Sequence, residues 1–226
     1  MNLFYLDEDM DKSAEYHVDK HIVKMPLEAA QILCTTIWID DLLGFVPRAL
    51  NAEEREVMNK AKAEIKHLPL EERPYPYLPM MYNHPCTIWA RESLENHEWV
   101  HCYANALNDE YHYRYGKLHK SIEQVVNKLP DPKNLPRAGF TTFGLAMPDD
   151  LKDYDNPIQS YRDYYHLDKA TFASWKYRIN SDLTLVSGLH YTNFLLNSSQ
   201  AIEPRAAIHW RFAPKSSFSL GYGKHS

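Results

Sequence analysis

The stretch YHVDKHIVKMPLE near the start of the chain brings together side chains that could perform acid–base or nucleophilic chemistry. Its polar members are spaced 4, 3 and 4 residues apart, at His17, His21, Lys24 and Glu28. A continuous helix would therefore carry them on one face, with Lys20 at its border. Two imidazoles, an amine and a carboxylate could supply a nucleophile, proton carriers and a group that stabilises developing charge. The alternative is an ordinary solvated helix face opposite an apolar stripe.

A second constellation starts at Asn83, His84 and Pro85, where proline fits the first position of a helix. Free N–H groups at a helix start favour a bound anion such as phosphate. Arg91 could add a bidentate contact to the same phosphate. A capped helix start with an ion-paired surface arginine explains the pattern equally well.

A third cluster, DEYHYRYGKLH at 109–119, interleaves tyrosines with Arg114, Lys117 and His119. Aromatic rings offer stacking faces and basic groups offer phosphate contacts, a combination suited to unstacked bases. The last expected helix, at 157–178, repeats the pattern, with Arg162 among its tyrosines. The alternative is a set of tyrosines half-buried in helix packing.

Two histidine pairs at i, i+4 spacing, His17/His21 and His97/His101, could chelate one ion. Neither pair has the HExxH form, and no further ligand stands at a matching spacing. The sequence therefore predicts no metal site and no cofactor.

The elements that must position these groups are mostly helices. An apolar stripe with steps of three and four residues predicts a helix from Ser13 onward, formed by Ile22, Met25, Ala29, Leu33 and Thr36. Pro26 interrupts it, so either the helix kinks or two helices meet near Met25. The further elements expected are a charged helix at 51–66 capped by Asn51, a long helix at 85–115 stopped by Gly116, and a last helix at 157–178.

After residue 178 the pattern changes to period-two alternation. It occurs at 183–191, 205–212 and 218–222, which predicts three β-strands. The fold class expected is mainly α: a multi-helix globular domain over 1–178 with a C-terminal β-hairpin or meander over 179–226.

Composition and charge limit the function. Apolar residues make up 44% and charged residues 24% of the chain, which is enough for a packed core. No stretch approaches eighteen apolar residues and the N-terminus is acidic, so we expect no membrane span and no export signal. The three cysteines lack metal-type spacing and suit reduced thiols in a cytosolic protein.

The charge is unevenly distributed. Residues 1–178 contain 21 basic and 28 acidic residues, a net charge of −7, whereas the tail has a net charge of +2. A body this acidic argues against broad, nonspecific binding to duplex DNA, which needs a phosphate-neutralising surface. Any contact with DNA must therefore use a local patch.

Residues 1–178 resemble a family of small, uncharacterised tailed-phage proteins. The resemblance rests on the ordered segments MNLFYLDED, HVDKHIVKMPLEAAQIL, NHPCTIWARES, DEYHYRYGKLH, AMPDD and YRDYY…FASWKYR. Pro26 departs from this family, which usually has an aliphatic residue there. The resemblance implies a phage protein that acts in the cytoplasm of an infected bacterial host.

That phage family is distantly similar to the pyrimidine-dimer DNA glycosylase/AP-lyases. The likeness lies in Asp19, His21 and Glu28, with the glutamate seven residues after the histidine, and in the Asn-His-Pro element at 83–85. It implies an amine that attacks the sugar C1′ to give a Schiff base, with Glu28 stabilising the developing cation and the base flipped out.

In those enzymes the attacking amine is the N-terminal amine left after loss of methionine. Asn2 is bulkier than the residues that usually permit this loss, so Lys20 and Lys24 are alternatives. Either lysine would need burial or neighbouring cations to lower the pKa of its amine.

The tail resembles consecutive strands of the outer-membrane barrel of TonB-dependent receptors, through EPRAAIHWRF and LGYGKHS. Three strands cannot close a barrel, so transport is not expected of this chain. A gene fusion, or a join made during sequence assembly, explains the tail better.

The sequence thus favours a phage DNA glycosylase/AP-lyase that acts on damaged or modified pyrimidines. The alternatives are a noncatalytic accessory protein that binds nucleic acid or a host protein, and an enzyme of nucleotide metabolism. The residues expected at the catalytic centre are Glu28, His21, Lys24 and Lys20. The residues expected to contact DNA are His17, Asn83, His84, Arg91, Arg114, Lys117, His119 and Arg162.

Overall fold

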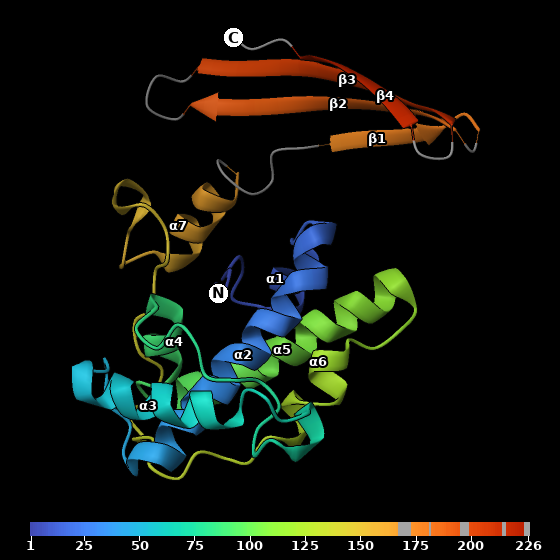
Figure 1. The fold of residues 1–226 in the computed structure, drawn as a ribbon. Coiled ribbons are helices and arrows are strands. Elements are labelled where there is room, and N and C mark those ends of the chain that lie inside the picture. The colour runs from blue at the N-terminus through green and yellow to red at the C-terminus, as the bar shows by residue number, and fades with distance from the viewer. Residues whose placement is uncertain (167–172, 181, 195–198, 214–215, 224–226) are drawn as a thin grey trace. The chain divides into compact units, whose positions relative to one another are not determined.

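The chain forms two compact units, Met1–Arg162 and Asp163–Ser226. The computed structural model describes residues 1–166, 173–180, 182–194, 199–213 and 216–223. The first unit is helical and the second is an antiparallel sheet (Figure 1). The predicted fold class, mainly α with a C-terminal β appendage, is confirmed.

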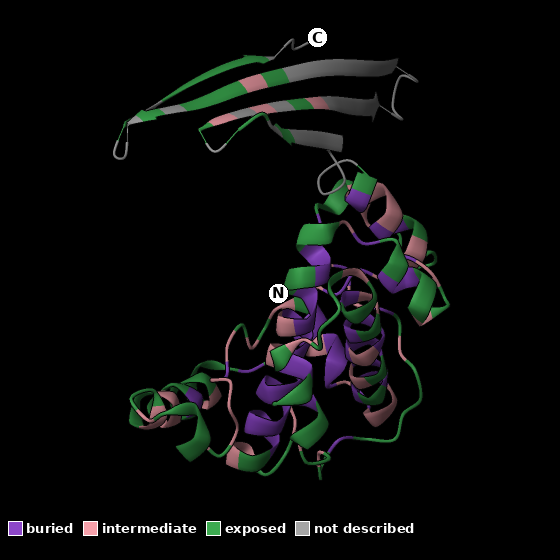
Figure 2. Ribbon diagram, turned by 90° about the vertical axis from the view of Figure 1, so that its right-hand side faces the viewer, coloured by how far each residue is buried: buried purple, intermediate pink, exposed green. Residues whose placement is uncertain are grey.

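Helix α2, Asp19–Leu43, is the centre of the first unit. Of its 25 residues 16 are buried, including every member of the apolar stripe predicted from the sequence. It packs against α5, Leu94–Tyr115, and the buried positions of these helices line the interior of the unit (Figure 2). α2 ends at Gly44, which adopts the left-handed conformation common after helices.

The remaining helical elements are shorter. They are α1 Met10–Glu15, α3 Ala52–Ile65, α4 Pro85–Ala90, α6 Lys120–Glu123, α7 Pro157–Tyr164, and the 3₁₀ turns Leu70–Glu72, Val126–Lys128 and Asp149–Leu151. Three boundaries predicted from the sequence are confirmed. Asn51 caps α3 and forms a reciprocal capping box with Glu54, Pro85 opens α4, and Gly116 ends α5.

Several predicted boundaries are wrong. The helix expected at 85–115 is two helices, because Ser93 accepts a hydrogen bond from the Asn96 amide and so starts a new helix. α2 starts only at Asp19, so His17 lies before it rather than on its face. Pro26 lies inside α2, which excludes the alternative of two helices that meet near Met25.

An aromatic core joins the extended N-terminal segment to α4, α5 and the loop that contains Phe143. The Phe143 ring centroid lies 4.1 Å from that of Trp89 and 4.9 Å from that of Tyr5. Gly144 follows in direct contact with α4, since an added Cβ would lie 2.7 Å from the Pro85 carbonyl oxygen. The loop can approach α4 this closely only because residue 144 has no side chain.

By length and composition alone, α2 could cross a membrane, with a mean hydropathy of 1.3 over its most apolar window. However, 78% of that window is buried inside the fold, as expected of a core helix. The absence of a membrane-spanning segment therefore stays a prediction.

The second unit is a four-stranded antiparallel sheet in which sequential strands are neighbours. Its strands are β1 Ala173–Arg178, β2 Leu183–Phe194, β3 Ser199–Ala213 and β4 Ser216–Gly223. The three strands predicted from alternation are confirmed as β2, β3 and β4. Trp210 and Phe218 are cross-strand partners and both are exposed.

The helix predicted to reach residue 178 is wrong where β1 lies. The segment ASWKYR alternates aromatic and polar residues, so it fits a strand as well as a helix, and pairing with β2 decides the outcome. The part of that expected helix at 167–172 lies outside the described residues.

We expect Gly144→Ala to lower the free energy of unfolding by about 1–3 kcal/mol, because the new methyl group would collide with backbone and with Trp89. Urea denaturation followed by circular dichroism measures the change. Thr142→Ala, at an exposed neighbouring position, is the matched control and should change stability by less than about 0.5 kcal/mol. Equal stability of the two variants would contradict the close approach.

Candidate functional site

The start of the chain lies against the buried carboxylate of Glu28. The backbone nitrogen of Asn2 donates a 2.7 Å hydrogen bond to Glu28 Oε2. Lys24 Nζ lies 2.9 Å from the other carboxylate oxygen, Oε1. Glu28 is only 7% exposed, so these two partners compensate the cost of burying its charge.

The side chain of Asn2 is held on both of its polar ends. Its Oδ1 lies 3.3 Å from Cys86 Sγ and 3.2 Å from the Tyr161 hydroxyl, and its Nδ2 donates to the Ala146 carbonyl at 3.1 Å. Burial raises the pKa of the Cys86 thiol to about 11, so this group stays protonated and can donate. These contacts fix residue 2, and therefore fix its backbone nitrogen on Glu28.

His84 completes this N-terminal site, which we define as Asn2, Glu28, Lys24 and His84. The His84 Nδ1 caps α4 by accepting from the Cys86 amide, so in the neutral ring the proton is on Nε2. Burial, followed by the positive charge of the N-terminal amine, lowers the His84 pKa to about 4, although Glu28 opposes the shift. His84 is therefore a neutral imidazole with an N–H donor beside the start of the chain.

The two histidines of the first constellation are buried. His21 is 7% exposed and stacks on Phe4, with ring centroids 5.0 Å apart. His17 is 2% exposed, and its Nδ1 lies 2.7 Å from the Ser13 carbonyl oxygen. Burial lowers the His17 pKa to about 3, so its ring is neutral. A DNA contact by His17 therefore does not fit the structure.

The solvated-face interpretation of this constellation is wrong for His21 and Glu28, which are buried. It holds for Lys20 and Lys24, which are exposed. The structure brings Lys24 to Glu28, whereas Lys20 lies one turn nearer the start of α2.

The Arg91 side chain is not accessible to a phosphate. It is 1% exposed, and its guanidinium donates to the carbonyl oxygens of Pro47, Arg48 and Thr87. The Asn83 side chain likewise pairs with the backbone of Leu50 in both directions. Both residues therefore fix the segment around residues 47–50 on α4.

Three more of the residues expected to contact DNA instead stabilise the fold through contacts within the protein. Arg114 binds the carboxylates of Asp19 and Glu110 and two carbonyl oxygens before α2. His119 caps α6, and its Nε2 lies 3.2 Å from the Val23 carbonyl oxygen. Arg162 binds the Leu6 carbonyl and the Asp7 carboxylate.

Lys117 has a different environment from these residues. It is exposed, and its amine lies 6.0 Å from the centroid of the Tyr111 ring. Its ammonium group is therefore accessible from solvent.

The structure thus brings together only part of the predicted set: Glu28, Lys24 and His84. Sequence reasoning missed Cys86 and Tyr161, whose role as anchors of Asn2 depends on contacts over 84 and 159 residues. The position of Cys86 in the NHPC element was the one available signal. Among the described residues, no group of three or more His, Cys, Asp or Glu side chains is arranged to hold a metal ion.

Comparison with known proteins adds no relative. No protein-family model matches the chain, and no curated protein or solved structure matches it.

We expect Arg91→Met to lower the free energy of unfolding by about 2–4 kcal/mol, because the carbonyl groups that Arg91 satisfies would lose their donors inside the protein. Urea denaturation measures this loss. The control is Arg48→Met, because Arg48 is exposed and pairs only at the surface with Glu92. A stable Arg91→Met protein would argue against the bracing role.

We expect stability to fall in acid through the buried histidine His97. Burial lowers its pKa from 6.5 to about 4, with His101 adding to the shift and Asp40 opposing it. Because the folded-state pKa lies below the unfolded one, this contribution is complete above about pH 6.5 and is lost progressively towards pH 4.

His97→Leu should remove up to about 1.4 kcal/mol per pH unit from the slope of unfolding free energy between about pH 6 and pH 4.5. His97 Nδ1 has no hydrogen-bond partner among the described residues. Replacing the ring by leucine therefore leaves no donor or acceptor unsatisfied there. Urea denaturation at several pH values gives the slope. His67→Leu, at an exposed position, is the control and should leave the slope unchanged.

Proposed function

We propose that the protein is a DNA-processing enzyme, a glycosylase/AP-lyase that acts on damaged or modified pyrimidines in a phage-infected bacterium. The observation that supports this best is the 2.7 Å contact between the Asn2 nitrogen and Glu28 Oε2. A carboxylate next to an amine is the pair that Schiff-base chemistry requires, since one group attacks and the other handles the proton and the charge.

The amine in this proposal is that of residue 2, freed by removal of Met1. With Met1 present, the Asn2 nitrogen is an amide and cannot attack. With Met1 removed, the same atom is a primary amine that is already hydrogen-bonded to Glu28. Lys24 is the alternative nucleophile because its amine also contacts Glu28, but it is exposed and so lacks the burial that a lysine nucleophile was expected to need.

In the proposed reaction the amine nitrogen bonds to C1′ of the deoxyribose while the bond from C1′ to the base breaks. Glu28 accepts a proton from the attacking amine, and the neutral His84 ring can donate a hydrogen bond from its Nε2–H to the departing base, which takes its proton from solvent. Opening of the sugar ring then gives an imine between residue 2 and C1′. Elimination at C2′ and C3′ breaks the bond to the 3′ phosphate, which completes the lyase step.

The second candidate is a noncatalytic accessory protein. The observation that favours it is charge: residues 1–162 contain 18 basic and 26 acidic residues, and Arg91, Arg114 and Arg162 are engaged within the fold. Such a surface suits a host-protein partner better than a broad DNA interface.

We expect a covalent adduct with abasic DNA under borohydride when the protein begins at Asn2, because borohydride reduces the imine to a stable amine. Such protein is made by cleaving a removable N-terminal tag directly before Asn2. The matched control retains Met1 with its amine acetylated, so that no N-terminal amine is free, and should give no adduct. Glu28→Gln, in the Asn2-first form, should lower the trapping rate at least about a hundredfold. Denaturing gel electrophoresis with labelled DNA measures the adduct.

The same experiment distinguishes the two nucleophiles and the two candidate functions. An adduct that persists with Met1 in place but disappears in Lys24→Arg would assign the attack to Lys24. No adduct and no strand cleavage in any form, on abasic or ultraviolet-irradiated DNA, would exclude the lyase and leave the accessory protein.

A further inference from the structure

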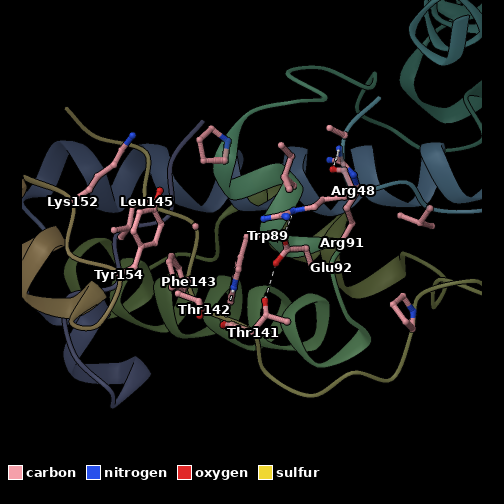
Figure 3. Close-up of a pocket in the computed structure, with 16 residues that line it drawn as sticks. Arg48, Trp89, Arg91, Glu92, Thr141, Thr142, Phe143, Leu145, Lys152 and Tyr154 are labelled. Carbon is pink, nitrogen blue, oxygen red and sulfur yellow. Dashed lines mark hydrogen bonds and ion pairs between the residues drawn. The ribbon is translucent and has the colours of Figure 1, made fainter. Parts of the chain in front are cut away.

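A groove on the first unit is distinct from the N-terminal site. It has a volume of about 820 Å³ and lies between α4, the segment around Arg48 and the loop that carries Thr141 to Leu145 (Figure 3). Roughly 300–1,000 Å³ is the size of typical small-molecule and cofactor sites. The groove is therefore large enough to hold part of an extended ligand.

The charge of the groove is opposite to that of the unit around it. Arg48 and Lys152 lie towards its two ends (Figure 3), whereas Glu92 is the one acidic residue of its lining. Both carboxylate oxygens of Glu92 are already bonded, Oε1 to Arg48 and Oε2 to the Thr141 hydroxyl at 2.9 Å. At the other end Lys152 pairs with Asp149 at 2.6 Å. The lining still holds three basic residues, Arg48, Arg91 and Lys152, against one acidic residue, within a unit that is otherwise acidic.

Aromatic and hydroxyl groups lie between these cations. Tyr154 is 56% exposed and lies towards the Lys152 end of the view (Figure 3). Trp89 and Phe143 also line the groove, and each is 1% exposed. Thr142, another lining residue, is exposed. An accessible ring next to a cationic channel is the combination with which proteins hold unpaired nucleotides.

The groove adjoins the N-terminal site across one short segment. Gly144 and Leu145 line the groove, while the carbonyl oxygens of Gly144 and Ala146 face Tyr161 and Asn2. Gly144 packs directly on Pro85, so the segment separates the two spaces. A chain held in the groove would pass next to the N-terminal site.

We propose that this groove binds an unpaired nucleic-acid strand, whose phosphates replace Asp149 and Glu92 as partners of Lys152 and Arg48, with a base stacked on Tyr154. The inference deepens the proposed function and rests on it for the nucleic acid as ligand. A duplex fits less well, since its second strand would lie against the acidic surface outside the groove.

The test uses a fluorescein-labelled DNA strand of about twelve nucleotides that carries no lesion and cannot form a hairpin. Fluorescence anisotropy gives the Kd for the full-length protein at several salt concentrations. The double variant Arg48→Ala with Lys152→Ala should raise the Kd at least about tenfold and reduce the slope of log K against log salt by about 1.4, for two lost phosphate contacts.

Tyr154→Ala should raise the Kd by about tenfold and Tyr154→Phe by less than about twofold, because the ring rather than the hydroxyl stacks. Lys60→Ala is the matched control, since Lys60 is an exposed lysine paired with a helical glutamate outside the groove. It should leave the Kd unchanged. Circular dichroism of each variant checks that it is folded.

A Kd that the groove variants do not change, or that Lys60→Ala raises equally, would overturn the proposal. Displacement of the strand by duplex of the same sequence at equal concentration would also overturn it. Because the probe has no lesion, binding is independent of catalysis. Strand binding without a borohydride adduct would reject the lyase alone, and an adduct with no effect of the groove variants would reject the groove alone.

Discussion

Burial of α2 is the constraint on which the first unit depends. The polar side chains that α2 buries are withdrawn from water, so each of these needs a partner within the protein. Those partners come from distant segments. Glu28 binds the start of the chain, Thr35 binds the backbone of Met80, and Asp40 binds the backbone of Lys133 and Asn134. The polar positions of one helix thus hold three separate parts of the chain in place.

The N-terminal site follows from the same constraint. Glu28 is buried where an uncompensated carboxylate would cost several kcal/mol, and a backbone nitrogen plus an ammonium group remove much of that cost. The anchoring of the Asn2 side chain by Cys86 and Tyr161 then gives this nitrogen a fixed position. In the proposed reaction, a nucleophile held in place before the substrate arrives would lose little entropy.

The basic residues illustrate how burial changes the meaning of a motif. Arg91 and Arg114 look like phosphate ligands in the sequence, yet their guanidinium groups satisfy carbonyl and carboxylate groups inside the fold. Arginine suits this use because it offers five donors in a fixed plane. Two other cations, Arg48 and Lys152, border the same groove although they are far apart in sequence, and each pairs with one carboxylate.

Elements whose signals are local follow directly from the sequence. The apolar stripe of α2, the cap at Asn51, the stop at Gly116 and the alternation of β2 to β4 depend on neighbouring residues, so they could be predicted without the structure. The accessibility of the polar groups could not be predicted from the sequence, since it depends on contacts between residues 26 to 159 positions apart. Spacing placed Lys24 and Glu28 together, but long-range packing buried His17 and Arg91 and brought Asn2 to Glu28.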